Sequence, residues 1–370
     1  MPTIAEASTP LWRQGFAVFV KLWDLTPDAP ADKVCMLVDA LDEVLLRRAG
    51  SASWFQNPYG GSALFLDVDT CLESVVDVIT SLSGTGAVIS IGIAWGNFER
   101  NFAVRDWNTV AIPVNTAARL ASIPEIRGRV AVHPKVREDM VRARDSYAGL
   151  TEQEQSATIK NTQFRYHLLK SPYRQSGVIE TRPKPSEGPG SISLKQANIV
   201  SFDIEKFSLE TETRQRELSQ TLFRHVEQSL NRVGQKPGDW TPAGDGGQVI
   251  FLAVPENSSP RALEFAQYLL DLPPQSGLRL RVGIDSGPIG ASRHRAAVGG
   301  ALLRADEISA CGNATAIAVS TRFWSGFPDA LKADVKTESS TMDSVLLLMT
   351  RSTAQSVLGK PVHDSLTLGS

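Results

Sequence analysis

The sequence predicts an α+β fold made of two similar halves, and three observations lead to this prediction. Short apolar runs, typical of buried strands, alternate with amphipathic stretches, typical of helices. The same order of segments occurs twice, with corresponding points about 182–191 residues apart, which indicates a duplicated domain. Between the two occurrences, residues 171–192 are rich in Pro, Gly and Ser and lack apolar periodicity, as in a linker. We therefore expect helices that cover one antiparallel-rich sheet in each half.

The second half shows these segments most clearly. Residues 198–202 (NIVSF) predict a buried strand, and the stretch 211–233 carries leucine or valine at every fourth position from 218 to 230, which predicts a helix. Two short runs joined through Gly244-Asp245-Gly246 predict a hairpin. The remaining predicted elements are a helix at 261–272, a strand at 278–284, a helix at 301–311 and a strand at 314–319.

The first half repeats this order. Its predicted elements are a strand at 15–20, a helix at 33–48, a hairpin at 58–66 with its tight turn at Gly60-Gly61, and a strand at 88–95. The segments 91–96 (IGIAWG) and 282–287 (VGIDSG) share both glycines and the isoleucine between them. This match aligns the two halves with each other.

Composition excludes several classes of protein. A chain of 370 residues suggests about two domains, and its formal net charge of −2 argues against a strongly basic chain that binds nucleic acid. Three cysteines at unrelated spacings form neither a disulfide framework nor a zinc motif, which fits a reducing compartment. No apolar run reaches the roughly 18 residues of a membrane span, and the first ten residues lack the features of a signal peptide. We expect a cytoplasmic protein with no membrane span.

Four short motifs stand out. Residues 203–208 (DIEKFS) follow an apolar run, residues 244–246 read GDG, residues 281–288 read RVGIDSGP, and residues 114–120 read VNTAARL. They resemble motifs of the class III nucleotidyl cyclases, the catalytic domains of adenylate and guanylate cyclases. The family patterns are D-I-x-x-F-[ST], G-D-[GSC], R-x-G-I-H-x-G-P and V-N-x-A-[AS]-R-L, and Asp285 replaces the usual His. The resemblance covers most of both halves.

This resemblance implies two tandem cyclase-like domains of the ferredoxin-like palm type, paired head to tail as a pseudo-heterodimer. Residues 1–170 would form a domain without metal ligands, 171–195 a linker, 196–351 the domain with metal ligands, and 352–370 a weakly structured tail. One chain would then supply both parts of a site, so further oligomerisation is not required.

The two halves have lost complementary residues. Alignment places Lys21 opposite Asp203 and Gly61 opposite Asp245, and neither can hold a divalent cation. In the other direction, Leu303 and Glu307 fall where the family has Asn and Arg, residues that the first half keeps at 115 and 119. The resemblance therefore implies one working site and one degenerate site.

The implied reaction is attack of the 3′-oxygen of a ribonucleoside triphosphate on its own α-phosphorus, which gives a 3′,5′-cyclic nucleotide and pyrophosphate. The family uses two divalent cations, Mg²⁺ or Mn²⁺, for which oxygen ligands are suited. The implied metal ligands are the carboxylates of Asp203 and Asp245 and the backbone carbonyl of Ile204. Phe207 and Ser208 lie in the turn that follows, whose N–H groups would cradle phosphates.

The first half would supply the other substrate contacts. Arg119 would stabilise negative charge at the α-phosphate, and Asn115, on the same helical face, would orient the ribose. Lys160 occupies the place of a phosphate-binding lysine. The two base-reading positions are Asn57 and Asn108, where adenylate cyclases have Lys and Asp and guanylate cyclases have Glu and Cys. This departure suggests similarity to the pyrimidine cyclases of Pycsar antiphage defence, which act on CTP or UTP.

Other interpretations of these residues stay open. The chain can be an adenylate cyclase that acts on ATP, a non-catalytic cyclase-like module that binds a nucleotide, or a palm-like enzyme that joins two nucleotides, although the VNTAARL motif speaks against the last. Asn57 before Pro58 can be a turn residue only. The basic run Arg293-His294-Arg295 is expected to be solvated.

Overall fold

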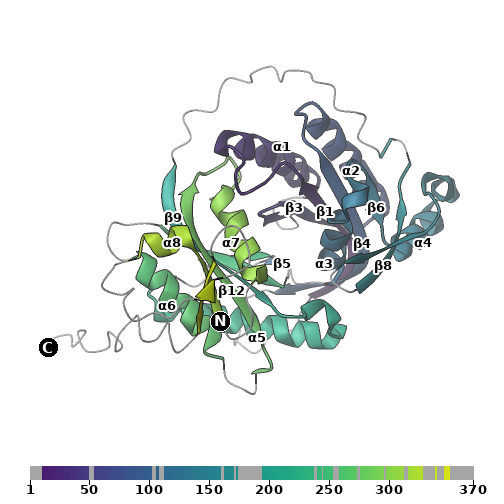
Figure 1. Cartoon of the computed structure of the whole chain (residues 1–370). Coiled ribbons are helices and arrows are strands. Elements are labelled where there is room, and N and C mark those ends of the chain that lie inside the picture. Colours follow the sequence, from purple (N-terminus) through teal and green to yellow (C-terminus); the bar gives the residue numbers. More distant parts are fainter. Residues whose placement is uncertain are drawn as a thin grey trace, which may run out of the picture.

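The computed structural model of the chain contains two β-sheets with helices on both faces of each (Figure 1). It describes residues 11–49, 54–101, 106–107, 112–159, 162–170, 172–173, 194–236, 240–243, 245–252, 258–272, 276–295, 297–311, 316–327, 338–339 and 346–350. The predicted linker lies almost wholly outside these residues, and the predicted tail lies wholly outside them. The predicted α+β class is confirmed.

The first sheet has the strand order β2-β3-β1-β4-β6-β8-β7, with β5 paired to β4. Its strands are β1 (Leu11–Leu22), β2 (Trp54–Asn57), β3 (Gly60–Phe65), β4 (Ile89–Asn101), β5 (Asp106–Trp107), β6 (Val130–Val132), β7 (Gln155–Ile159) and β8 (Thr162–Leu168). The accompanying helices are α1 (Ala31–Ala49), α2 (Val68–Ser83), α3 (Ile112–Ala121), α4 (Pro134–Ala143) and the 3-10 turns η2 (Pro124–Ile126) and η3 (Asp145–Leu150). These elements are called the first half below.

The second sheet has the matching order β10-β11-β9-β12-β13-β15-β14. Its strands are β9 (Lys195–Ile204), β10 (Trp240–Ala243), β11 (Gly246–Leu252), β12 (Leu280–Ile289), β13 (Ala316–Ser320), β14 (Glu338–Ser339) and β15 (Leu346–Thr350). The accompanying helices are η4 (Phe207–Leu209), α5 (Glu212–Arg232), α6 (Ser258–Leu270), α7 (Gly300–Cys311) and α8 (Thr321–Ser325). These elements are called the second half. In both sheets the first strand of the half, β1 or β9, lies third in the order and pairs antiparallel to both neighbours.

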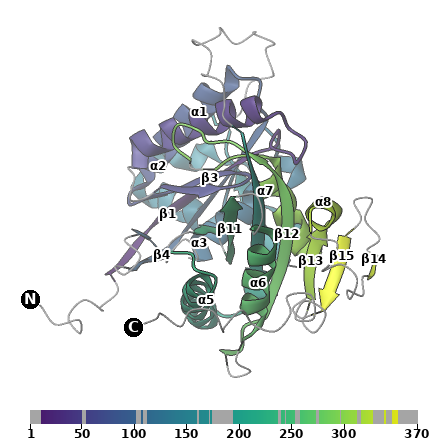
Figure 2. The ribbon, with the colours of Figure 1, turned by 90° about the vertical axis from the view of Figure 1, so that its left-hand side faces the viewer.

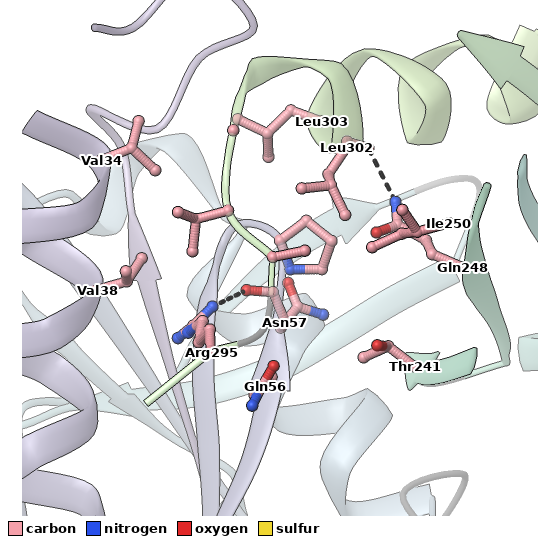
Figure 3. Close-up of a pocket in the computed structure, with 14 residues that line it drawn as sticks. Val34, Val38, Gln56, Asn57, Thr241, Gln248, Ile250, Arg295, Leu302 and Leu303 are labelled. Atoms are coloured by element: carbon pink, nitrogen blue, oxygen red, sulfur yellow. Dashed lines mark hydrogen bonds between the residues drawn. The ribbon is translucent and has the colours of Figure 1, made fainter. Parts of the chain in front are cut away.

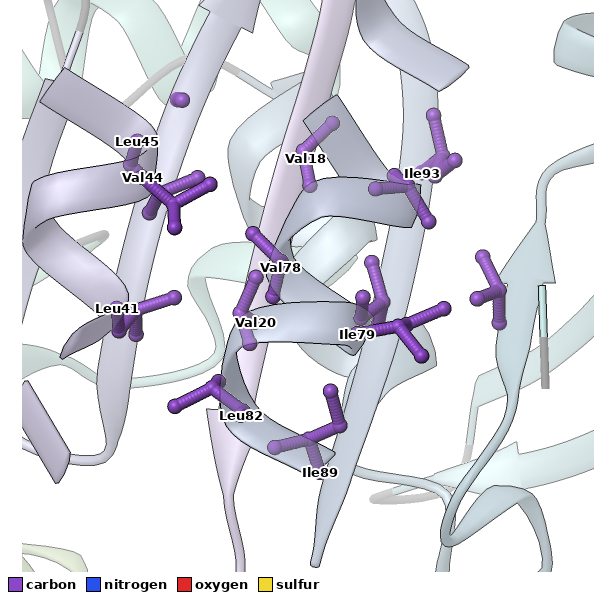
Figure 4. Packing of buried hydrophobic residues seen from close by; sticks show 14 of the residues in the cluster. Val18, Val20, Leu41, Val44, Leu45, Val78, Ile79, Leu82, Ile89 and Ile93 are labelled. Carbon is purple, nitrogen blue, oxygen red and sulfur yellow. The ribbon is translucent and has the colours of Figure 1, made fainter. Parts of the chain in front are cut away.

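Each sheet has a core on both faces because alternate residues of its strands point to opposite sides. In the first half, Val18 and Val20 pack under α1 and α2, as Figure 4 shows, while Ala17 and Phe19 pack against α3. Figure 2 shows α1 and α2 on one side of the first sheet and α3 on the other. The second half repeats the arrangement, with α5 and α6 on one face and α7 on the other.

Two matching glycines allow α3 and α7 to lie close to their sheets. A Cβ at Gly92 would come within 1.9 Å of the carbonyl oxygen of Ala117, and a Cβ at Gly283 would come within 2.6 Å of that of Ala305. These are the glycines shared by IGIAWG and VGIDSG. Because the contacts correspond, the two helices are offset by 188 residues (305 − 117), which aligns Asn115 with Leu303 and Arg119 with Glu307, as the sequence predicts.

The first hairpin differs from the prediction. Asn57 pairs with Gly60, so the turn consists of Pro58 and Tyr59 and not of Gly60 and Gly61. The backbone N–H of Tyr59 donates to the side-chain Oδ1 of Asn57 at 2.9 Å, which is the hydrogen bond of an Asx turn. The side chain of Asn57 thus stabilises a turn that lies two residues before the predicted one at Gly60-Gly61.

The strand register corrects the alignment of the two hairpins. Lys21 and Asp203 each pair with the first residue of the next hairpin strand, β3 and β11 respectively. Counting back from that residue places Tyr59, and not Gly61, at the position that corresponds to Asp245. The sequence alignment on glycines was therefore wrong by two residues in this hairpin.

Hydrogen bonds between the halves join residues 27–60 of the first to residues 291–306 of the second. Arg295 is 4% exposed, and its Nε and Nη2 donate to the two carboxylate oxygens of Asp42, each at 2.6 Å. Its Nη1 and Nη2 also reach the carbonyl oxygens of Asn57 and Gly60. The expectation that the basic run is solvated is therefore wrong for Arg295, because a fully buried carboxylate of the other half pairs with it.

The membrane prediction was tested on the described helices. None of those in the described part of the chain combines the length and the apolar character that a bilayer span requires.

Candidate functional site

The two predicted metal-binding carboxylates lie at neighbouring backbone positions. Asp203 is the penultimate residue of β9, and Asp245 lies in the turn between β10 and β11. Asp203 pairs across the sheet with Gly246, the residue that follows Asp245. The backbone N–H of Ile204 donates to the carbonyl oxygen of Asp245 at 2.9 Å. Strand pairing therefore brings the two aspartates together although 42 residues (245 − 203) separate them.

A third charged residue, Arg281, reaches this site from the opposite neighbouring strand. It stands directly across from Asp203 in the β12–β9 register. Its Nε donates to Asp203 Oδ1 at 2.8 Å, and its Nη2 donates to Asp203 Oδ2. Burial disfavours the charged guanidinium, but the hydrogen bond and charge of Asp203, aided by Asp245 and Glu205, raise the pKa of Arg281 above its usual value.

The first half contributes Asn115 and Arg119 on α3. Asn115 Nδ2 and Arg119 Nη1 are both buried and have no hydrogen-bond partner. Buried donors without partners are rare in folded proteins, and two on successive turns of one helix point to a ligand that accepts hydrogen bonds. Burial lowers the pKa of Arg119, and the negative charge of Asp245 opposes this shift. The guanidinium also lies 5.8 Å from the ring centre of Phe164.

Charges from both halves therefore act on Asp245. Arg281 belongs to the same half as Asp245, and Arg119 belongs to the other, yet the carboxylate influences the pKa of each. A carboxylate of the second half that acts on an arginine of the first agrees with the shared site expected from the sequence. The roles of the individual residues stay predictions.

At the end of β9 and just after it, the residues predicted to bind the metal or the phosphates can offer mainly backbone groups to a ligand. Ile204 and Phe207 are buried in the core of the second half, so their side chains are not available to a substrate. Ser208 is half-buried within η4. The predicted contact of Phe207 with substrate is thus restricted to main-chain groups. Lys160 and Asn108 lie outside the described residues.

The register changes the candidate base-reading position. The sequence places the base-reading position four residues before the one that corresponds to Asp245. The register identifies the residue that corresponds to Asp245 as Tyr59. Counting from Tyr59 gives Phe55, which pairs with Ser62 as Thr241 pairs with Gln248 in the second half. Asn57 lies next to the turn and uses its Oδ1 there. The count that selected Asn57 used the shifted alignment, and a base-reading role for Asn57 stays a prediction without that support.

Side chains of both halves meet at the positions that correspond to Asp203, Asp245 and Arg119. The hydroxyl of Tyr59 donates to Asp306 Oδ2 at 2.9 Å, and burial raises the pKa of Tyr59 well above its usual range. Lys21 lies 4.1 Å from the ring centre of Trp23, and burial lowers its pKa. Burial raises the pKa of Glu307, which replaces the arginine.

Asp285, at the position where the motif of the class III cyclases has His, pairs with a neighbouring arginine. Asp285 is fully buried, and Arg304 Nε donates to its Oδ2 at 3.0 Å. Arg304 Nη2 also donates to the carbonyl oxygen of Pro27 in the first half at 3.2 Å. Asp285 therefore helps to fix α7 and the contact between the halves.

A small cavity of about 70 Å³ lies between the halves, next to the first hairpin (Figure 3). Gln56 and Asn57 line it from the first hairpin, and Thr241, Gln248 and Leu302 line it from the second half. Figure 3 shows that Gln248 is bonded to the backbone of Leu302 and that Arg295 closes the side next to Asn57. The cavity is too small for a nucleotide.

The donor set at Asp203 and Asp245 suits a hard divalent cation, which prefers oxygen ligands and keeps bound water. No group of three or more His, Cys, Asp or Glu side chains suited to a metal occurs among the described residues. Strand pairing sets Asp203 beside the turn that holds Asp245, and the part of the Ile204 carbonyl as a third ligand stays a prediction. The unpaired donors of Asn115 and Arg119 fit the anionic, oxygen-rich ligand that would accompany such a cation.

The sequence matches no known family model and no curated protein. Among solved structures, the chain is similar to a class III adenylyl cyclase-like ATP-binding protein from Pseudomonas aeruginosa, with a TM-score of 0.61 and 14% identity over 95% of this chain and 92% of that chain. It is also similar to the guanylyl cyclase domain of the RhoGC fusion protein from the aquatic fungus Blastocladiella emersonii (TM-score 0.34, 16% identity, 43% of this chain and 97% of that chain). The adenylyl cyclase CyaB from P. aeruginosa gives a TM-score of 0.33 at 13% identity over 44% of this chain and 95% of that chain.

At 14% identity the likeness concerns the fold, and it extends over nearly the whole length of both chains. The chain therefore has a class III cyclase-like fold with two sheets.

Proposed function

We propose that the chain is a nucleotidyl cyclase that converts a ribonucleoside triphosphate to a 3′,5′-cyclic nucleotide and pyrophosphate at one site shared by its two halves. The observation that carries the proposal is the pair of buried donors without partners on α3 of the first half, Asn115 Nδ2 and Arg119 Nη1. In the second half Asp203 stands beside the turn that holds Asp245, and the charge of Asp245 acts on Arg119. In this proposal the halves pair head to tail, as in the family.

The residues divide the work by charge. Asp203 and Asp245 would hold one or two divalent cations, Mg²⁺ or Mn²⁺. When bound, these would supply positive charge to the triphosphate and lower the pKa of the attacking hydroxyl. Arg119 directs its unpaired Nη1 to the phosphate, where charge develops in the transition state. Asn115 orients the ribose through its unpaired Nδ2.

The proposed substrates are CTP or UTP. The corrected position holds Phe55 rather than the Lys or Glu of the purine cyclases, so the departure from both purine-reading pairs persists after the register is corrected. In a bacterium the cyclic product would act as a signal in antiphage defence, as the resemblance implies.

A nucleotide panel tests the proposal. The full chain is incubated with ATP, GTP, CTP or UTP and with Mg²⁺ or Mn²⁺, and the products are identified by mass. We expect a cyclic pyrimidine nucleotide and pyrophosphate, with a loss of about 100-fold or more in Asp203→Asn and Arg119→Ala. Arg165→Ala removes an exposed arginine that pairs with Glu154 and should retain activity. Turnover of ATP alone would replace the pyrimidine assignment with that of an adenylate cyclase.

A second candidate is a nucleotide-binding module without turnover. The bidentate pair between Arg281 and Asp203 favours it, because a carboxylate held this way is not ready for a metal. The similar structure from P. aeruginosa is described as an ATP-binding protein. Saturable nucleotide binding with no product from any of the four triphosphates would support this candidate and contradict the cyclase.

A further inference from the structure

We propose that Arg281 competes with the metal for Asp203, so that the site excludes a free divalent cation and accepts one only together with an anionic ligand. This inference rests on the proposed metal-dependent function. It gives Arg281, a residue of the RVGIDSGP motif, control over access of the cation to Asp203.

The geometry of the pair carries the inference. Arg281 engages both oxygens of Asp203, Oδ1 through Nε and Oδ2 through Nη2. The two residues lie opposite one another on adjacent strands, Asp203 near the end of β9 and Arg281 near the start of β12, and the side chains of Arg281 and Asp203 are 20% and 21% exposed. The remaining Nη1 donates to the carbonyl oxygen of Ala310 near the C-terminal end of α7 at 3.4 Å. The guanidinium is therefore held in place on two sides.

A cation at Asp203 must take the same oxygens that the guanidinium uses. Bidentate pairs between arginine and carboxylate are among the strongest hydrogen bonds in proteins, and breaking one in a partly buried place leaves a charge uncompensated. A cation that arrives alone offers the released guanidinium no new partner and adds positive charge beside it. A cation that arrives with an anionic ligand brings a replacement partner, so the exchange becomes favourable. The pair thus couples metal binding to ligand binding.

A neighbouring pair provides a control of the same chemistry. Arg279, two residues before Arg281, donates through Nε to Glu205 at 2.9 Å, just beyond the end of β9. Arg279 is 68% exposed, and Glu205 is not among the implied metal ligands. Removing either arginine deletes one positive charge near Asp203, but only Arg281 is bonded to the carboxylate oxygens of Asp203. A comparison of the two variants separates competition from a general change in charge.

The experiment measures Mn²⁺ binding to the full chain by electron paramagnetic resonance, which counts free Mn²⁺ without requiring turnover. We expect Arg281→Gln to lower the dissociation constant for Mn²⁺ alone about tenfold or more, because the competing pair is gone. Arg279→Gln should change it less than about threefold. Arg281→Lys keeps the charge but loses the bidentate fork, so its effect should be intermediate. The double variant Arg281→Gln with Asp203→Asn should lose the gain.

The second measurement is coupling between metal and nucleotide. Binding of a 3′-deoxyribonucleoside triphosphate, which lacks the attacking oxygen, is measured by equilibrium dialysis with and without Mn²⁺. The affinity of Mn²⁺ for the free nucleotide is the same in every experiment, so differences between variants report the protein. We expect strong mutual enhancement in the wild type and weaker enhancement in Arg281→Gln.

The outcomes for Arg281 and for the cyclase can be told apart. Equal Mn²⁺ affinity in the wild type, Arg281→Gln and Arg279→Gln overturns the competition, whether or not the nucleotide panel gives product. If Arg281→Gln binds Mn²⁺ more tightly, and Asp203→Asn abolishes that gain, the competition stands. If in addition neither the wild type nor any variant converts a triphosphate, the cyclase proposal fails. Circular dichroism identifies a variant that does not fold, in which case Arg281→Lys decides.

Discussion

Asp42 of α1 and Arg295, 253 residues later in the loop after β12, form a bidentate ion pair with almost no solvent exposure where the two halves meet. Trp54 Nε1 also donates to Asp42, at 3.3 Å. The guanidinium is further bonded to two carbonyl oxygens of the first hairpin. All these groups are satisfied by one another, so the pair fixes the relative position of α1, the hairpin and the loop.

Replacement of Arg295 by methionine should therefore be strongly destabilising. It leaves Asp42 buried without its counter-ion, which typically costs about 3–5 kcal/mol. Urea unfolding of the full chain measures the change. The control is Arg293→Met, since Arg293 is 71% exposed and its side chain lies 3.7 Å from Glu43, so a loss below about 1 kcal/mol is expected. Equal losses in both variants would show that the buried pair contributes nothing specific.

Replacement of Gly92 by alanine should displace α3. The added Cβ would lie 1.9 Å from the carbonyl oxygen of Ala117 and 2.8 Å from the backbone nitrogen of Ala121, and neither backbone atom can move alone. We expect a loss of about 1–3 kcal/mol in stability and of roughly 100-fold in cyclic nucleotide formation, because Asn115 and Arg119 move with the helix. Gly84→Ala is the control, since a Cβ there meets nothing within 4 Å. A fully active Gly92→Ala would mean that the position of α3 does not matter for turnover.

Replacement of Asn115 by leucine copies the residue that the second half has at Leu303. Its Nδ2 is a buried donor without a partner, and such a group typically costs about 1–3 kcal/mol. The variant should therefore be no less stable than the wild type in thermal unfolding, while product formation falls about 100-fold. Asn231→Leu, on an exposed position of α5, should leave product formation unchanged. Strong destabilisation by Asn115→Leu would indicate a structural role instead.

The stability of the chain should depend on pH through His225. Its Nε2 donates to the carbonyl oxygens of Tyr268 and Leu269, which ties α5 to the end of α6. Burial lowers the pKa of His225, with Arg232 contributing, although the two hydrogen bonds oppose the shift. Because the unfolded state then binds more protons than the folded state, the contribution to stability is complete above about pH 6.5 and is lost as the pH falls through the folded pKa.

Urea unfolding between pH 7.5 and pH 5 tests this sign. The free energy of unfolding of the wild type should fall as the pH decreases, and His225→Gln, which cannot take up the proton, should fall less steeply. Parallel curves for the two proteins would show that His225 does not titrate differently on unfolding.

Features that depend on neighbouring residues could be predicted from the sequence alone. Apolar periodicity located α5 and α7, and the shared glycines of IGIAWG and VGIDSG aligned the two halves, so the alignment of Asn115 with Leu303 and of Arg119 with Glu307 was confirmed. The pairing of Asp203 with the Asp245 hairpin followed from motif order. Each of these inferences uses a local repeat of hydrophobicity or backbone conformation, which a short segment expresses by itself.

Features that depend on pairing across the sheet or between the halves were decided only by the tertiary structure. The sequence placed the first hairpin turn on two glycines, but cross-strand register moved it to Pro58 and Tyr59. The partners of Arg281 and Arg295 lie 78 and 253 residues away, and no local pattern marks an arginine that will be buried. A long charged side chain is usually exposed to solvent. Its burial becomes favourable only where a carboxylate pairs with it in good geometry, and the whole fold creates that geometry.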